Sequence, residues 1–173
     1  MKRILVTGAT GQIGSELTVA LRKRIGNDNV IAAGHHRKPS DALLNSGPFE
    51  VIDVNHRESL EEVVEKFDLD TIFHLAAVLS ATGEQNPQYA WNLNMGSLYN
   101  VLEIAREQEL ARIFWPSSIA VFGPTTPRID TPQETVLIPT TIYGVTKVAG
   151  ELLCNYYFAK YGVDVRGLRY PGI

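Results

Sequence analysis

Cysteine is almost missing from this chain, and its scarcity excludes several classes of protein. Cys154 is the only cysteine among 173 residues, so neither an internal disulfide nor a cysteine-rich zinc site can form. His35, His36 and His56 show no metal-ligand spacing with one another or with Cys154, and we predict no bound metal. Nothing in the sequence suggests a Ser-His-Asp triad or a pair of catalytic carboxylates.

The chain also lacks an excess of positive charge and a long apolar run. Its net charge is −3, which gives no electrostatic reason to expect nucleic acid or an anionic membrane as a partner. No apolar run approaches the roughly 20 residues that span a bilayer. A strand is predicted to begin at Arg3, which leaves no room for a signal peptide. We therefore expect a cytoplasmic protein that acts on a small molecule.

The chain does contain a regular alternation of strand-like and helix-like segments. Short apolar runs typical of buried parallel strands occur at residues 4–6, 30–33, 50–52, 71–75, 112–115 and 163–168. Helical patterns are predicted at 13–25, 60–67, 86–110 and 140–161, and loops at 34–48 and 117–139. This order predicts one α/β domain over residues 1–173. We expect a Rossmann-type doubly wound parallel sheet of about six strands, in the order 3-2-1-4-5-6, with ligands at the carboxyl ends of the strands.

A glycine-rich segment joins the first predicted strand to the first predicted helix. Gly8 permits a tight turn, Gly11 lets the backbone approach a pyrophosphate, and Gly14 allows helix and strand to pack closely. Gln12 and Ile13 begin the helix, where backbone N–H groups face an anion. We predict that these five residues bind a dinucleotide. The alternative is a glycine-rich turn without a ligand.

The end of the second predicted strand departs from the usual dinucleotide pattern. An acidic residue there normally binds the ribose 2′-hydroxyl, but this chain has Gly34 followed by His35 and further cationic side chains. Arg37 or His35 could contact a 2′-phosphate, or the segment could be a solvated basic loop. Asp53 and Val54 are predicted cofactor contacts. Asp53 could accept a hydrogen bond from the adenine amino group, or cap the following helix. We predict NAD as the cofactor and leave NADP open.

A tyrosine and a lysine form the core of the predicted catalytic group. Tyr143 and Lys147 are four residues apart, so they share one face of a helix. A lysine ammonium beside a phenol favours the phenolate and lowers a pKa that is normally about 10. The phenol can then take a proton from a substrate alcohol. Lys147 could also donate hydrogen bonds to the nicotinamide ribose.

A serine completes the predicted catalytic group. Ser118 follows the fifth predicted strand, where its hydroxyl could hold a substrate oxygen, although it or Ser117 could instead cap a turn. Together with the glycine-rich segment, these residues predict an enzyme that oxidises or isomerises alcohols with a nicotinamide cofactor. We expect His74, which ends the fourth predicted strand, to be a packed histidine rather than a catalyst.

These motifs resemble the extended short-chain dehydrogenase/reductase superfamily. The matching segments are Thr7–Gly14, His74–Ala77, Pro116–Gly123 and Tyr143–Lys147. Within that superfamily the chain resembles the epimerase-type NAD-dependent L-threonine 3-dehydrogenases. That likeness is carried by Leu79–Glu84, Phe122–Arg128 and Leu168–Ile173. The resemblance runs the whole length of the chain.

The resemblance implies oxidation of the L-threonine 3-hydroxyl to give 2-amino-3-ketobutyrate. It makes Tyr143 the base, Lys147 its pKa modulator and ribose ligand, and Ser118 the residue that positions the hydroxyl. It maps the substrate loop onto Ser80. It maps the surroundings of the nicotinamide onto Leu75, Ala76, Pro171 and Ile173. We add that Arg128, the only cation in segment 117–139, could pair with the substrate carboxylate.

The chain departs from the family's pattern in two respects. The family usually has an aspartate where Gly34 stands, and it continues beyond Ile173 into a smaller C-terminal substrate domain that these residues do not include. The family's helices that correspond to 86–110 and 140–161 form a dimer interface, so the resemblance implies a homodimer. Two alternatives stay open: a sugar-nucleotide epimerase or dehydratase of the same superfamily, and a non-catalytic cofactor-binding fragment.

Overall fold

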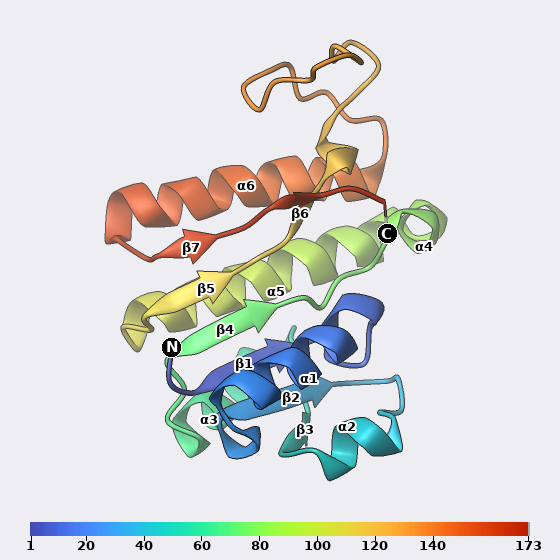
Figure 1. Cartoon of the computed structure of the whole chain (residues 1–173). Helices are drawn as coiled ribbons and strands as arrows, with labels where there is room; N and C mark the ends of the chain where they lie inside the picture. Colours follow the sequence, from blue (N-terminus) through green and yellow to red (C-terminus); the bar gives the residue numbers. More distant parts are fainter. Residues whose placement is uncertain (173) are drawn as a thin grey trace.

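A computed structural model describes residues 1–172 and contains the parallel sheet expected from the sequence (Figure 1). Six strands hydrogen-bond in the order β3-β2-β1-β4-β5-β7, and every pair is parallel. Their bounds are β1 (Ile4–Thr7), β2 (Val30–Gly34), β3 (Phe49–Val51), β4 (Thr71–His74), β5 (Arg112–Phe114) and β7 (Val165–Arg166). The predicted strand order is therefore confirmed, with β7 as the sixth strand.

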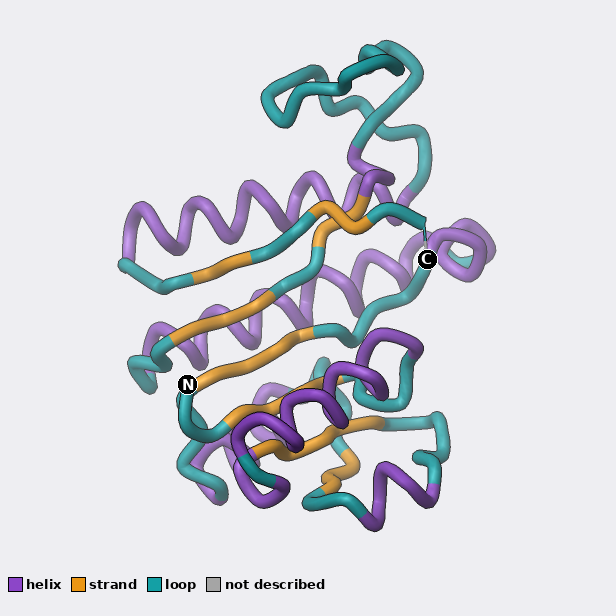
Figure 2. The backbone as a smooth tube through the Cα atoms, viewed as in Figure 1, coloured by secondary structure: helices purple, strands orange, loops and turns teal. Residues whose placement is uncertain are grey.

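Helices cover both faces of this sheet (Figures 1 and 2). They are α1 (Gln12–Ile25), α2 (Asp41–Asn45), α3 (Arg57–Lys66), α4 (Ser80–Gln85), α5 (Pro87–Glu107) and α6 (Ile142–Tyr161). Helices α1 and α2 pack on one face, and α3, α5 and α6 pack on the other. The doubly wound arrangement predicted from the alternation of elements is confirmed.

The central strand β1 supplies both hydrophobic cores. Ile4 and Val6 belong to the cluster that includes Leu43 of α2, whereas Leu5 belongs to the cluster that includes Leu60 of α3. Successive side chains of a strand point to opposite faces, so a strand covered on both sides must be apolar throughout. This is why Ile4 to Val6 reads as a continuous apolar run and is at most 1% exposed.

Beyond the sheet, the segments that follow β5 and β7 pair a second time. β6 (Ser117–Ser118) pairs with β8 (Arg169–Tyr170) in parallel. The strand predicted over 163–168 is present but shorter, as β7, and β8 is a further short strand beyond Gly167 that was not predicted. A Cβ on Gly167 would lie 2.2 Å from the carbonyl oxygen of Trp115, so the chain crosses Trp115 too closely for any side chain. This second pairing carries Ser118 past the carboxyl edge of the main sheet.

Four short helical segments of the described residues were not predicted, and the first is the 3₁₀ turn η1 (Asn27–Asn29) between α1 and β2. Helix α2 lies inside the expected loop 34–48, and it is capped by Ser40, whose Oγ accepts a hydrogen bond from the Leu43 N–H at 3.2 Å. The 3₁₀ turn η2 (Ile119–Val121) lies inside the expected loop 117–139, and α4 follows β4. Such short segments have too few residues for a helical apolar period, so the sequence pattern does not reveal them.

The long helices begin and end at recognisable capping residues. Asn86 accepts a hydrogen bond from the Tyr89 N–H at 3.1 Å and starts α5, as predicted. Thr141 accepts one from the Gly144 N–H at 3.0 Å, so α6 begins two residues later than expected. Gly162 ends α6 with a φ of 75°, a left-handed conformation that favours glycine. None of the helices in residues 1–172 is long and apolar enough to cross a membrane.

Candidate active site

The glycine-rich segment forms the turn between β1 and α1. Gly8 has a φ of 68°, which residues with a side chain rarely adopt. A Cβ on Gly8 would lie 2.8 Å from the backbone nitrogen of Ala76, and a Cβ on Gly14 would lie 2.2 Å from the carbonyl oxygen of Gly8. These two glycines therefore let β1, α1 and the segment after β4 approach one another closely.

Gly11 differs from these two glycines because its surroundings are less crowded. A Cβ on Gly11 would meet only the carbonyl oxygen of Gly8, at 3.2 Å. Gly11 is also the N-cap of α1, and no side chain among the described residues caps that end of the helix. The N–H groups of the first helical turn lack partners within the helix and attract anions. The exposed backbone at Gly11 thus fits a pyrophosphate.

A groove in two adjoining parts runs along the carboxyl edge of the sheet. Gly8, Gly11, Leu75 and Ala77 line both parts. The inner part has a volume of about 380 Å³ and the outer part about 370 Å³. Of the predicted site residues, the inner part is also lined by Gln12, Ile13, Gly14, Ser80, Ser118, Tyr143 and Lys147. The outer part is also lined by Arg37, Asp53, Val54 and Ala76.

One predicted site residue lies away from this groove, and another is not among the described residues. Arg128 lies on the exposed segment between η2 and α6, which projects from the body of the molecule in Figure 1, and it lines neither part. Ile173 lies outside the described residues.

Tyr143 and Ser118 lie beside each other in the inner part. Tyr143 is in the first turn of α6, and Ser118 ends β6. Burial raises the pKa of Tyr143 above its ordinary value of about 10, and its hydrogen bond with Ser118 acts in the opposite direction. The Ser118 hydroxyl also accepts a hydrogen bond from the Ala120 N–H at 3.1 Å. Ser118 is therefore both a turn cap and a groove residue, two roles that the sequence presented as alternatives.

Lys147 lies one turn further along α6 and is only 3% exposed. Its Nζ donates a hydrogen bond to the carbonyl oxygen of Pro116 at 2.7 Å and lies 4.3 Å from the centroid of the Trp115 ring. The same Nζ lies 5.4 Å from the centroid of the Tyr143 ring, so the two residues share a helix face as predicted. Burial lowers the pKa of Lys147 to about 8.

The net pKa shift of Tyr143 is opposite to the one predicted from the sequence. We expected Lys147 to lower that pKa, but burial of the phenol dominates and raises it. The Lys147 ammonium is directed to the carbonyl oxygen of Pro116, and no hydrogen bond within the described part of the chain joins it to the phenolic oxygen. Tyr143 is consequently protonated at neutral pH in this structure.

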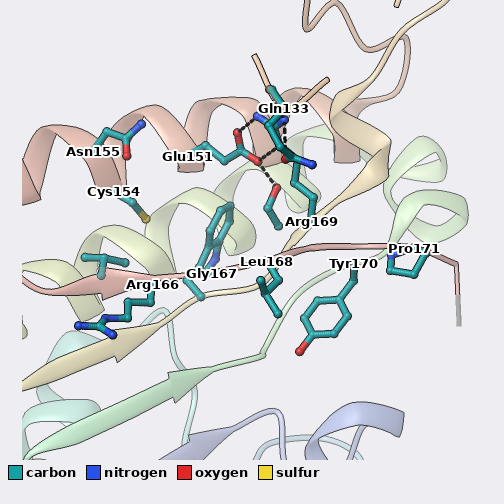
Figure 3. Close-up of a pocket in the computed structure, with 13 residues that line it drawn as sticks. Gln133, Glu151, Cys154, Asn155, Arg166, Gly167, Leu168, Arg169, Tyr170 and Pro171 are labelled. Atoms are coloured by element: carbon teal, nitrogen blue, oxygen red, sulfur yellow. Dashed lines mark hydrogen bonds and ion pairs between the residues drawn. The ribbon is translucent and has the colours of Figure 1, made fainter. Parts of the chain in front are cut away.

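A partly buried ion pair beside the groove was missed in the sequence analysis (Figure 3). Arg169 of β8 donates two hydrogen bonds to the carboxylate of Glu151 on α6, at 2.8 and 2.7 Å. The Ser117 hydroxyl donates a third to the same carboxylate, at 2.5 Å. Burial by itself would raise the pKa of Glu151, but the hydrogen bonds from Arg169 and Ser117, together with the charges of Arg169 and Lys147, hold that pKa below its ordinary value. One carboxylate thus ties together the three elements that position Ser118.

The surroundings of this ion pair form a further cavity of about 610 Å³. It shares Ser117, Tyr170 and Pro171 with the inner part of the groove. Figure 3 shows Glu151 and Cys154 reaching into it from α6. The sequence signal for this arrangement is weak, because Arg169 lies 18 residues after Glu151 and only the β6–β8 pairing brings the two together.

His74 is a structural residue, as predicted. It is 1% exposed; its Nδ1 lies 2.9 Å from the Thr7 hydroxyl and its Nε2 lies 2.9 Å from the Ser97 hydroxyl. Burial lowers the pKa of His74 to about 3, and the nearby Lys147 charge adds to this, so the ring is neutral at neutral pH. Within residues 1–172, no cluster of three or more His, Cys, Asp or Glu side chains could hold a metal ion.

Comparison with known proteins gives these features a context. The sequence profile of the NAD dependent epimerase/dehydratase family matches residues 4–173. An uncharacterized epimerase/dehydratase of Staphylococcus haemolyticus is 57% identical over 173 residues, which cover 100% of this chain and 54% of that protein.

Solved structures of two dehydrogenases are similar to the chain throughout. L-threonine dehydrogenase from Clostridium difficile superposes with a TM-score of 0.96 at 54% identity, covering 99% of this chain and 54% of that one. The GalE-like L-threonine dehydrogenase from Cupriavidus necator, in its holo form, superposes with a TM-score of 0.94 at 53% identity, covering 98% and 55%. The chain thus spans about half the length of these relatives. Because the family profile matches nearly every residue, the chain belongs to the NAD-dependent epimerase/dehydratase family.

Proposed function

We propose that this chain is the cofactor-binding and catalytic part of an NAD(P)-dependent L-threonine 3-dehydrogenase. The reaction would oxidise the 3-hydroxyl of L-threonine and give 2-amino-3-ketobutyrate. The observation that carries the proposal is the inner groove, in which Tyr143 and Ser118 lie beside the glycine turn. The similarity to two L-threonine dehydrogenases, at more than 50% identity, supports this choice of substrate.

Each polar residue of the inner groove has a role in this proposal. Ser118 holds the substrate hydroxyl, since its own hydroxyl can donate while it accepts from the Ala120 N–H. Tyr143 acts as general base only after its phenol has lost its own proton to solvent, and the phenolate then takes the proton of the substrate hydroxyl. The bound nicotinamide supplies the hydride acceptor. Ser80 lines the same groove and would contact the substrate there.

Lys147 has two roles in the proposed reaction. An ammonium group has three donors, and only one is used by the carbonyl oxygen of Pro116. The others are free to hold the nicotinamide ribose. The positive charge, 5.4 Å from the Tyr143 ring centroid, also favours ionisation of the phenol before the transfer, against the upward shift of its pKa that burial causes.

Arg128 remains our candidate for the substrate carboxylate. It is exposed and would have to reach the groove from the segment that projects beyond η2. The test is the Arg128→Ala variant, for which we expect a higher Michaelis constant for threonine and an unchanged constant for the dinucleotide. An unchanged constant for threonine would remove Arg128 from the site.

Two other functions compete with this one. A sugar-nucleotide epimerase or dehydratase is the first, because the family's own description includes both activities. A non-catalytic cofactor-binding fragment is the second, because the chain spans about half of its relatives. In that case the groove would bind a dinucleotide without turnover.

A matrix of cofactors and substrates separates the three functions. NAD and NADP are each combined with L-threonine or a UDP-sugar, for this chain and for a longer version. With threonine the absorbance of the reduced nicotinamide is followed. With the UDP-sugar the sugar product is analysed, because an epimerase or dehydratase returns the hydride to the sugar and releases no reduced cofactor. Reduction with threonine supports the proposal. Turnover of the UDP-sugar alone favours the epimerase or dehydratase. Calorimetric binding of the dinucleotide with no turnover by either version contradicts a dehydrogenase.

We also propose that the chain forms a homodimer through α5 and α6. A surface groove between these helices is lined by Trp91, Met95, Tyr99 and Leu153. Trp91 and Tyr99 are exposed by 43% and 51%, which is unusual for large aromatic residues. Sedimentation at several protein concentrations tests the dimer, and a Tyr99→Lys variant should shift it toward the monomer.

A further inference from the structure

The outer part of the groove has an unusual chemical lining at the end of β2. Its wall there consists of Gly34 and the exposed side chains of His35, His36 and Arg37. The ring centroids of the two histidines are 3.7 Å apart, so the rings lie against each other. This wall adjoins the glycine turn, since Gly8 and Gly11 line both parts of the groove.

The missing acid at Gly34 changes which nucleotide this wall can accept. A carboxylate at the end of the second strand binds the 2′-hydroxyl of the adenosine ribose and repels a 2′-phosphate. Gly34 has no side chain to do either. A Cβ on Gly34 would come 3.0 Å from the Thr10 methyl and 3.2 Å from the Phe49 ring. Thr10 and Phe49 therefore pack closely against Gly34 at the surface of the groove.

The cations of this wall are available to a ligand. The ion pairs formed by residues 1–172 do not include Arg37. An arginine guanidinium presents several donors in one plane and binds phosphate through two of them. Lys38 is exposed next to Arg37 and adds to the positive potential.

One carboxylate opposes these cations. Asp53 lines the same part of the groove, at the end of β3. Its Oδ1 accepts a hydrogen bond from the Asn55 N–H at 3.0 Å, and its Oδ2 lies 3.9 Å from Nε2 of His56. Asp53 is therefore directed partly toward its own turn, and it follows β3, the strand beyond the one that carries Gly34.

We propose that the end of β2 is a 2′-phosphate site, with Arg37 as its main ligand and His35 and His36 beside it. The chain then binds NADP more tightly than NAD. This inference rests on the groove assigned above to the cofactor, and it gives the identity of the dinucleotide that the groove prefers. It does not depend on which alcohol is oxidised.

The test compares two nucleotides that differ only in the 2′-phosphate. Adenosine 2′,5′-bisphosphate and adenosine 5′-monophosphate are titrated calorimetrically into the chain, without nicotinamide or threonine. We expect the 2′-phosphate to tighten binding at least tenfold, because a hydrogen-bonded charge contributes that much or more. Equal affinity, or tighter binding of the monophosphate, overturns the proposal. Failure of both nucleotides to bind overturns it together with the cofactor groove.

Two pairs of variants assign the effect to residues. Gly34→Asp should abolish the preference for the bisphosphate, whereas Gly34→Asn, which has the same shape without the charge, should keep it. Arg37→Ala should weaken the bisphosphate at least tenfold and leave the monophosphate unchanged. Arg24→Ala removes an exposed cation in the last turn of α1 and should change the affinity for neither nucleotide. If Gly34→Asp and Gly34→Asn show the same preference between the two nucleotides, the proposed 2′-phosphate site is wrong. It is also wrong if Arg37→Ala and Arg24→Ala bind the bisphosphate with the same affinity. Threonine oxidation is measured separately, so a chain that prefers the bisphosphate without oxidising threonine would refute only the proposed function.

Discussion

The two ends of the groove hold their charged side chains in opposite ways. At the catalytic end, Lys147 is 3% exposed and directed to a carbonyl oxygen, and the Glu151 carboxylate is engaged by Arg169 and Ser117. At the nucleotide end, Arg37 and its neighbours are exposed. Packing within the protein therefore fixes the positions of the catalytic groups before any ligand binds. At the nucleotide end the cationic side chains are exposed to solvent and can bind a ligand. The predictions below test this contrast, beginning with the largest effect.

Replacing Tyr143 by phenylalanine should have the largest effect on activity. General acid–base groups typically contribute about 10²- to 10⁴-fold, so we expect the turnover number to fall about 10³-fold. Dinucleotide affinity should change little, because the phenol acts on the alcohol. The control is Tyr156→Phe, which removes an exposed hydroxyl from the same helix. A Tyr143→Phe enzyme that keeps most of its activity would show that another group takes the proton.

Alanine substitution at two glycines of the turn should separate folding from binding. Gly14→Ala places a methyl 2.2 Å from the carbonyl oxygen of Gly8, so the backbone must shift. We expect a loss of roughly 3 kcal/mol in the free energy of unfolding, as in overpacked sites. Gly11→Ala should fold normally and bind the dinucleotide at least tenfold more weakly, because its methyl enters the space assigned to the pyrophosphate. Denaturant unfolding and calorimetry measure the two effects. If Gly11→Ala binds the dinucleotide with unchanged affinity, Gly11 does not lie at the pyrophosphate site.

Removing the Glu151 charge should destabilise the catalytic end. Glu151→Gln leaves Arg169 without its carboxylate, and the two side chains are only 21% and 17% exposed. We expect a loss of about 2 kcal/mol, the range for hydrogen bonds to charged groups. The matched control is Glu50→Gln, whose partner Lys66 is 60% exposed, and there we expect less than about 1 kcal/mol. Equal losses in urea unfolding would show that the Glu151 pair is no better positioned than a surface pair.

His74 should make stability depend on pH in a narrow acidic range. Its pKa is about 3 in the folded chain and about 6.5 when unfolded, so between these values the unfolded chain binds a proton that the folded chain does not. The contribution is complete above pH 6.5 and is lost as the pH falls, by about 1.4 kcal/mol per pH unit. Unfolding free energies between pH 4 and 7 measure the slope. His74→Gln should flatten it, whereas His56→Gln, which removes an exposed histidine, should not. An unchanged slope in His74→Gln contradicts this explanation.

Most of the fold was predictable because its signals are local. The apolar run of β1, the caps at Asn86 and Gly162, and the alternation of elements each depend on a few neighbouring residues. The general rules for parallel sheets then give the strand order. The errors fall where a segment is too short for a period, as in α2, or where distant segments meet, as at Gly167.

The candidate site divides in the same way. The residue types of the glycine turn and the spacing of Tyr143 and Lys147 suffice to predict a dinucleotide groove and a helix face, because both are properties of one continuous segment. Burial and long-range partners are not properties of one segment. Only the packing of α6 against the paired strands β6 and β8 raises the pKa of Tyr143, directs Lys147 to Pro116 and joins Glu151 to Arg169. The amino-acid order therefore specifies which groups are present, and the tertiary structure decides their protonation and their partners.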